Sequence, residues 1–98
     1  MELIAVLELT FKPESLDKAR EVMTRVLGET RGFPGCVSVK SVIDGRDPNT
    51  WRFVETWESA EHDAAYRKFR AGEGAITDLG PLLAASPSLV TGSVDPLM

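Results

Sequence analysis

The chain has 98 residues, 43% of them hydrophobic and 27% charged, and this composition fits one globular domain over residues 1–98 with no length left for a second core. Its net charge of −4 argues against a nucleic-acid partner, and we interpret the only cluster of bases, Arg67, Lys68 and Arg70, as a solvated helix face. Without a membrane-spanning apolar stretch or a secretory leader, and with Cys36 as the single cysteine, the sequence predicts a cytoplasmic protein with no membrane partner.

The first third of the chain predicts a strand followed by a helix. Residues 2–11 alternate with period two, which predicts a strand with two partly apolar faces. One face carries Leu3, Ala5, Leu7, Leu9 and Phe11, and the other carries Ile4, Val6, Glu8 and Thr10. Apolar residues then recur at helical spacing between a cap at Ser15 and a stop at Gly32, which predicts an amphipathic helix.

The middle of the chain predicts a β-hairpin. Residues 36–43 are rich in valine and serine, residues 44–49 are dense in turn formers, and residues 50–58 alternate again. The alternation places Trp51, Phe53, Glu55 and Trp57 on one face of the third strand, and Arg52, Val54 and Thr56 on the other.

The last third predicts helices and a final strand. Ser59 is expected to cap a second helix that ends near Gly72 and Gly74. Its inward stripe is expected at i, i+3, i+4 and i+7, on His62, Ala65, Tyr66 and Phe69. Ile76, Leu79 and Leu83 suggest a short third helix, and residues 88–95 a last strand with Val90 and Val94 on one side.

The order β-α-β-β-α-(α)-β predicts a ferredoxin-like α+β fold with a four-stranded antiparallel sheet and its helices on one face. The other face would then leave Ile4, Val6 and Val54 in water unless a second copy covered it. The sequence therefore predicts a homodimer in which two sheets pack face to face as a dimeric α+β barrel.

Three short segments carry a family resemblance. Pro34-Gly35-Cys36-Val37-Ser38, the turn Asp47-Pro48-Asn49, and above all the run of residues 53–59, Phe-Val-Glu-Thr-Trp-Glu-Ser, resemble the antibiotic biosynthesis monooxygenase family over about residues 2–84. The resemblance implies a pocket between sheet and helices, faced by Trp57. It also implies a cofactor-independent oxygenase, in which a deprotonated, electron-rich phenol reacts with dioxygen directly. Haem-degrading members of the superfamily have asparagine and histidine where this chain has Leu7 and Tyr66, so the resemblance does not extend to haem.

The expected pocket would be lined by Phe53, Glu55 and Trp57 from the third strand and by His62, Tyr66 and Phe69 from the second helix, with Leu7 beside them. Each polar candidate has a structural and a functional interpretation. Glu55 is either half of an ion pair or a base, and His62 either a half-exposed helix residue or a base. Tyr66 either packs with its hydroxyl at the rim or donates to a ligand, and Trp57 is a core aromatic or a stacking wall for a flat substrate.

The absence of several sequence motifs limits the kinds of catalytic or cofactor site to expect. One histidine and one cysteine cannot supply a metal-ligand set, and no phosphate-binding glycine loop or nucleophile elbow is present, so no metal or cofactor is expected. The preferred function is a cofactor-independent monooxygenase of a small aromatic, phenolic or quinol-like substrate. The alternative is a small dimeric binding or stress-associated protein that holds an apolar metabolite without catalysis.

Overall fold

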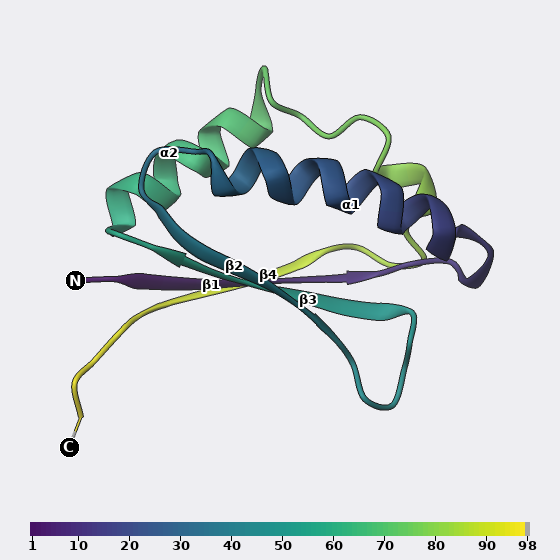
Figure 1. The fold of residues 1–98 in the computed structure, drawn as a ribbon, viewed down its shortest axis with the longest axis horizontal. Helices are drawn as coiled ribbons and strands as arrows, with labels where there is room; N and C mark the ends of the chain where they lie inside the picture. The colour runs from purple at the N-terminus through teal and green to yellow at the C-terminus, as the bar shows by residue number, and fades with distance from the viewer. Residues whose placement is uncertain (98) are drawn as a thin grey trace.

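The computed structural model describes residues 1–97 and consists of one sheet with two helices on one side of it (Figure 1). The elements are β1 (Leu3–Thr10), α1 (Leu16–Arg31), β2 (Cys36–Ile43), β3 (Thr50–Trp57), α2 (Ala60–Ala71) and β4 (Ser88–Ser93), with single 3₁₀ turns at Pro13–Ser15 and Gly80–Leu82. This order confirms the ferredoxin-like α+β fold with its four-stranded antiparallel sheet. No helix within residues 1–97 is long and apolar enough to cross a membrane.

The sheet has the order β2-β3-β1-β4, so β1 and β3 form its centre. Ala5 pairs with Glu55 and with Thr91, and Leu7 pairs with Phe53 and with Leu89. Because side chains alternate across a pleated sheet, these rows share the face under the helices. The register therefore brings Leu7, Phe53 and Glu55 to the middle of that face.

Two apolar clusters join the helices to the sheet. The larger one fixes α1 and contains Leu9, Phe11, Ala19, Val22, Met23, Val26, Leu27, Val39, Trp51 and Phe53. The smaller one lies under α2 and contains Leu3, Ala5, Trp57 and Tyr66, with Phe33, Cys36 and Phe69 packed against it. The amphipathic pattern expected for the first helix is confirmed, since its buried residues recur at helical spacing: Ala19, Val22, Met23, Val26, Leu27 and Thr30.

The third helix expected near residues 76–83 is not formed as an α-helix. This segment consists of turns and the 3₁₀ turn Gly80–Leu82. Gly80 is a poor helix former, and Pro81 has no backbone N–H to donate, so a helix over these few residues is not stable. The last strand also ends earlier than expected, at Ser93, which leaves Val94 outside it.

The buried stripe of α2 differs from the expected one. Asp63 and Tyr66 are buried, Arg67 pairs with Glu55 of β3, and Arg70 is partly buried against α1, while Ala65 is exposed and His62 and Phe69 are partly covered. The spacing of i, i+3, i+4 and i+7 is as expected, but the helix is rotated by one residue. Polar side chains of α2 thus point inward, and Ala65 does not.

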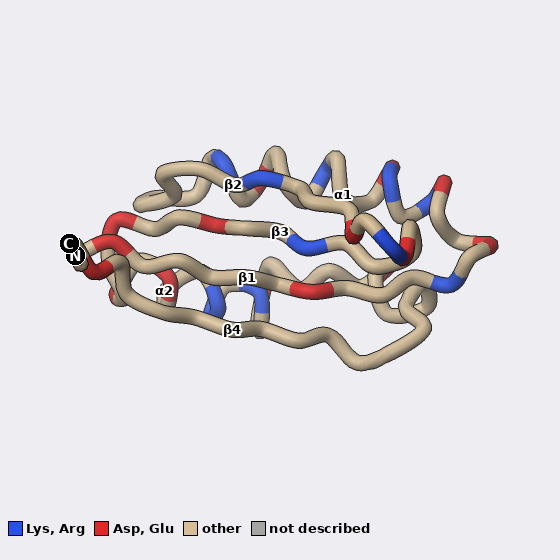
Figure 2. The backbone as a smooth tube through the Cα atoms, turned by 90° about the horizontal axis from the view of Figure 1, so that it is seen from below, with Lys and Arg blue, Asp and Glu red and all other residues tan. Residues whose placement is uncertain are grey.

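The sheet face away from the helices is open (Figure 2). Val6 pairs with Val54 on one side and with Val90 on the other, and Val90 is 64% exposed. Beside these valines Arg52 donates to Glu8 over 2.9 Å and to Asp44 over 2.8 Å. The hydrogen bond from Arg52 lowers the pKa of the Asp44 carboxyl below its usual value. A second copy that packs on this face would cover the three valines.

We predict that Val6→Asp or Val54→Asp weakens self-association, because each would place an unpaired carboxylate between two packed sheets at a cost of several kcal/mol. Val6→Ile, which keeps the site apolar, is the matched control. Sedimentation equilibrium over a range of micromolar concentrations measures the effect. A wild-type monomer, or unchanged association in both aspartate variants, would contradict the expected interface.

Candidate functional site

A cavity of about 160 Å³ lies between the sheet and the two helices. Its apolar wall comes from β1, α1, β3 and the segment that follows α2: Leu7, Met23, Val26, Leu27, Phe53, Ile76 and Leu79. Its polar wall comes from α1, β3 and α2: Thr30, Glu55, Tyr66, Arg67 and Arg70. A mostly apolar cavity with a few converging polar groups is the usual form of a small-molecule site.

Glu55 is the buried carboxylate of this cavity, with 3% of its surface exposed. Trp57 Nε1 donates to its Oε1 over 3.0 Å, and Arg67 forms an ion pair with the same oxygen. Arg67 is in turn held by Asp63, one turn earlier on α2, at 3.1 Å. The first carboxylate oxygen is therefore fixed from two sides.

The second oxygen of Glu55, Oε2, accepts no hydrogen bond from any of residues 1–97. Throughout that part of the chain, every fully buried side-chain oxygen or nitrogen has a partner. Oε2 must therefore be the accessible part of this carboxylate. Since Glu55 lines the cavity, Oε2 is the atom that can accept a proton from a ligand.

The Tyr66 hydroxyl belongs to a second network, on the α1 side of the cavity. It lies 2.6 Å from Thr30 Oγ1 and accepts a hydrogen bond from Arg70 Nε over 2.8 Å. The Thr30 hydroxyl donates to the Val26 carbonyl over 2.9 Å, and a hydroxyl has one hydrogen. Tyr66 is therefore the donor to Thr30, so its proton is already engaged in a protein hydrogen bond.

Arg70 connects three of the segments that surround the cavity: α1, α2 and the segment after α2. Besides Tyr66, its guanidinium reaches Glu29 and the Gly74 carbonyl, each over 3.0 Å, and the Val26 carbonyl over 3.3 Å. These contacts tie α2 to the end of α1 and to the segment that carries Ile76 and Leu79. Arg70 thus both lines the cavity and holds its wall in place.

A second ion pair secures the same segment from outside. Arg25 on α1 donates to the Asp78 carboxylate from Nη1 over 3.0 Å and from Nη2 over 2.8 Å. The hydrogen bond from Arg25 lowers the pKa of the Asp78 carboxyl below its usual value. Both side chains are largely exposed, so solvent weakens this attachment.

The structure brings some of the expected site residues together and separates others. Leu7, Phe53, Glu55 and Tyr66 line the cavity. Trp57, His62 and Phe69 do not, so the expectation that one cavity would be lined by all six strand and helix candidates is wrong. Trp57 is fully buried and packs against Tyr66, with 4.9 Å between the ring centroids. Its indole contacts the cavity only indirectly, through its hydrogen bond to Glu55.

His62 and Phe69 lie on the side of α2 that faces residues 33–36, and not on the side that faces the cavity. The His62 ring packs against Gly35, whose positive φ of 88° and missing side chain leave it room, and its Nδ1 is 2.7 Å from the Ser59 hydroxyl. Its side chain is 42% exposed. Phe69 packs against Phe33 and over Gly74. The rotation of α2 is the reason that both residues miss the cavity.

The residues that make the cavity polar are not among those expected from the sequence. Thr30 is not among the expected site residues, and the interpretation of Arg67 and Arg70 as a solvated helix face is wrong. Glu55 was the sequence signal that could have located these arginines. A carboxylate buried beneath a helix needs a positively charged partner, and that helix can supply one. Arg67 and Arg70 share the i, i+3, i+4, i+7 stripe with Asp63 and Tyr66, so this requirement would have fixed the rotation.

Cys36 lies half-buried beside Trp57 at the start of β2. Burial raises the pKa of its thiol above the ordinary value, and the negative charge of Glu55 adds to this effect. No group of three or more potential metal ligands occurs within residues 1–97. The position agrees with a packing role for this cysteine.

Comparison with known proteins gives a family and a common fold. The model of the family described as "Antibiotic biosynthesis monooxygenase" matches residues 3–74. No curated protein matches the chain. A solved structure described as an antibiotic biosynthesis monooxygenase is 22% identical, with a TM-score of 0.80, and the match covers 96% of this chain and 99% of the other.

Two further solved structures share the fold at lower identity. A conserved protein from Methanosarcina mazei Go1 is 14% identical, with a TM-score of 0.84 and coverage of 94% of this chain and 91% of the other. A variant of SnoaB, described as a cofactor-independent oxygenase from Streptomyces nogalater, is 13% identical, with a TM-score of 0.82 and coverage of 99% and 96%. At these identities the likeness establishes the fold.

We predict that Thr30→Val destabilises the protein by about 1–3 kcal/mol, because it leaves the buried Tyr66 hydroxyl without its acceptor. Thr24→Val is the matched control, since Thr24 also donates to a carbonyl four residues earlier on α1 but is exposed. Urea unfolding of both variants measures the difference. Equal midpoints would show that the Tyr66 network does not contribute to stability.

We also predict that Cys36 reacts slowly with iodoacetamide near neutral pH in the native protein and faster after unfolding in urea. The reagent attacks the thiolate, and a raised pKa in the folded state reduces the thiolate fraction until the pH is well above the ordinary thiol value. The pH profile of alkylation, followed by mass spectrometry, should therefore shift upward on folding. A native profile that lies below the unfolded one would contradict this.

Proposed function

The chain belongs to the antibiotic biosynthesis monooxygenase family, and we propose that it is a cofactor-independent monooxygenase of a small phenolic or quinol-like substrate held in the cavity between sheet and helices. The observation that carries the proposal is the environment of Glu55. One oxygen of this carboxylate is fixed by Trp57 and Arg67, and the other has no hydrogen-bond partner among residues 1–97, at the polar wall of a cavity whose other wall is apolar. Such a group can take a proton from a bound hydroxyl without first losing a protein partner.

The size of the cavity supports a substrate with one aromatic ring. Its volume is about 160 Å³, and an apolar protein cavity of roughly 150 Å³ is large enough to bind benzene. Phe53, Leu7 and the leucine and methionine side chains of α1 would surround the ring. The substrate hydroxyl would then face the polar wall, where Glu55 lies.

The proposed reaction needs no electron donor besides the substrate. Glu55 Oε2 accepts the phenol proton, the phenolate transfers one electron to dioxygen, and the two radicals combine at a ring carbon. Return of the proton gives a hydroperoxide, which loses water to form the quinone. One oxygen atom enters the product and the other leaves as water, so the substrate supplies all four electrons. The guanidinium of Arg70, at the cavity wall, would stabilise the negative charge that develops on oxygen.

A second candidate function is binding without catalysis, and one observation favours it. The cavity cations are already paired, Arg67 with Glu55 and Asp63, and Arg70 with Glu29, and the Tyr66 proton is donated to Thr30. A cavity whose polar groups satisfy one another can hold an apolar molecule and leave it unchanged. Tight binding of a phenol without oxygen uptake would support this function.

We predict that Glu55→Gln lowers the turnover of phenol or hydroquinone by about 10² to 10⁴, the usual contribution of a positioned base. His62→Ala should leave turnover within about twofold, because its imidazole lies outside the cavity. Oxygen uptake in an oxygen electrode, corrected for oxidation in buffer alone, measures both rates. Circular dichroism checks that each variant is folded.

The reverse result would identify a different base. If His62→Ala abolished uptake and Glu55→Gln did not, His62 would be the proton acceptor and the substrate would bind near Gly35. Wild-type uptake no faster than in buffer, for both substrates, would reject the oxygenase function.

A further inference from the structure

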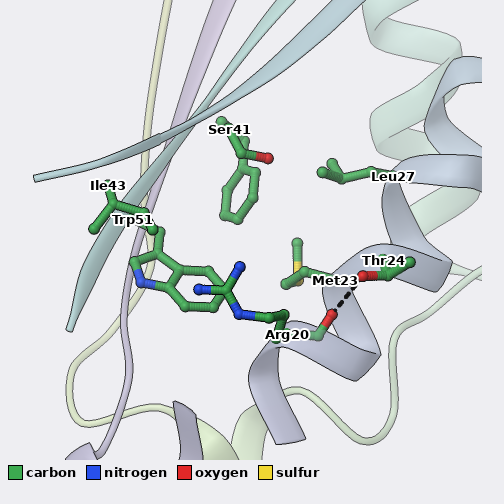
Figure 3. A pocket seen from close by; sticks show the side chains of 8 residues that line it. Arg20, Met23, Thr24, Leu27, Ser41, Ile43 and Trp51 are labelled. Atoms are coloured by element: carbon green, nitrogen blue, oxygen red, sulfur yellow. Dashed lines mark hydrogen bonds between the residues drawn. The ribbon is translucent and has the colours of Figure 1, made fainter. Parts of the chain in front are cut away.

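A second, smaller hollow of about 90 Å³ lies on the other side of the cavity wall, between α1 and the strands β2 and β3 (Figure 3). It is lined by Arg20, Met23, Thr24, Leu27, Ser41, Ile43, Trp51 and Phe53. Most of these side chains are apolar. The Thr24 hydroxyl donates to the Arg20 carbonyl over 2.7 Å and is therefore already partnered.

The two hollows are separated by side chains that they share. Met23, Leu27 and Phe53 line both of them. Met23 is unbranched and has three rotatable side-chain bonds, so it can change its conformation more easily than its neighbours. Of the three shared side chains, Met23 is therefore the one best able to move aside and open a passage between the inner cavity and the outer hollow.

Arg20 gives the outer hollow a chemical preference. Its guanidinium lies 5.3 Å from the centre of the Trp51 ring, at the rim of the hollow (Figure 3). No carboxylate of residues 1–97 forms an ion pair with it, whereas Arg67 and Arg70 at the inner cavity are both paired. An exposed, unpaired guanidinium next to an apolar hollow suits a ligand carboxylate, which it can bind through two parallel hydrogen bonds.

We infer that the two hollows form one site for a phenol that carries an apolar arm ending in a carboxylate. The ring occupies the inner cavity near Glu55, the arm passes Met23, and the carboxylate binds Arg20. Only the placement of the ring rests on the proposed function. Arg20 is then the residue that determines specificity for the acidic arm, and it takes no part in the reaction.

Calorimetric titration with three probes tests this inference: phenol, para-hydroxyphenylpropionate, and its uncharged amide. The wild type should bind the acid at least about tenfold more tightly than the amide, the scale of a hydrogen bond to a charged group. Arg20→Gln should abolish this preference and leave phenol binding unchanged. Lys18→Gln, which removes a positive charge from the same helix outside both hollows, is the matched control and should retain the preference.

A second variant tests the path of the arm. Ser41→Leu would fill the outer hollow from β2, so it should weaken both arm-bearing probes and leave phenol unaffected. Equal affinity of the acid and the amide for the wild type, or a preference that survives Arg20→Gln, would overturn the inference while phenol binding still supported the inner site. Absence of binding of all three probes would overturn both the inner site and its extension.

Discussion

The ion pair between Glu55 and Arg67 determines how the second helix sits on the sheet. Glu55 is fixed on the helix face of β3 by the pleat, and its charge is almost fully buried. Leaving one partner of such a pair alone costs about 3–5 kcal/mol. Tyr66 is buried and Phe69 partly buried as the helix stands, so turning it to bury Ala65 would contribute roughly 1 kcal/mol for the one methyl group of Ala65. The cost of an unpaired buried charge exceeds this gain, so the helix turns its arginines inward.

The rest of the site follows from that rotation. With Arg67 inward, Tyr66 and Arg70 also face α1, and their polar ends meet Thr30 near the end of that helix. The cavity lies between this polar wall and the apolar side chains of β1, β3 and α1. The same rotation turns His62 away from the cavity.

The sequence was sufficient to place side chains where its periodicity fitted only one arrangement. Strand alternation correctly placed Leu7, Phe53 and Glu55 under the helices, because a shift of one residue would move each of them to the open face. It was not sufficient for α2, whose spacing fits two adjacent rotations, one with Ala65 inward and one with Arg67 inward. Hydrophobicity alone favours the rotation with Ala65 inward. Only Glu55, which is distant in the sequence, decides between the two rotations. The prediction of a helix near residues 76–83 was wrong for another reason. The leucines of this segment pack against the core from turns and not from a helix.

The walls of the cavity are held in place by different kinds of interaction. The wall formed by β1 and β3 is part of a continuous hydrogen-bonded sheet. The wall formed by Ile76 and Leu79 belongs to a segment without regular structure, attached to the helices by the Arg70 contact to Gly74 and by the exposed pair of Arg25 and Asp78. Exposed ion pairs contribute little to stability, so this wall depends mainly on Ile76 and Leu79, which pack against the larger apolar cluster. The sheet side of the cavity is therefore fixed by backbone hydrogen bonds, and the side at residues 76–79 is fixed by side-chain packing.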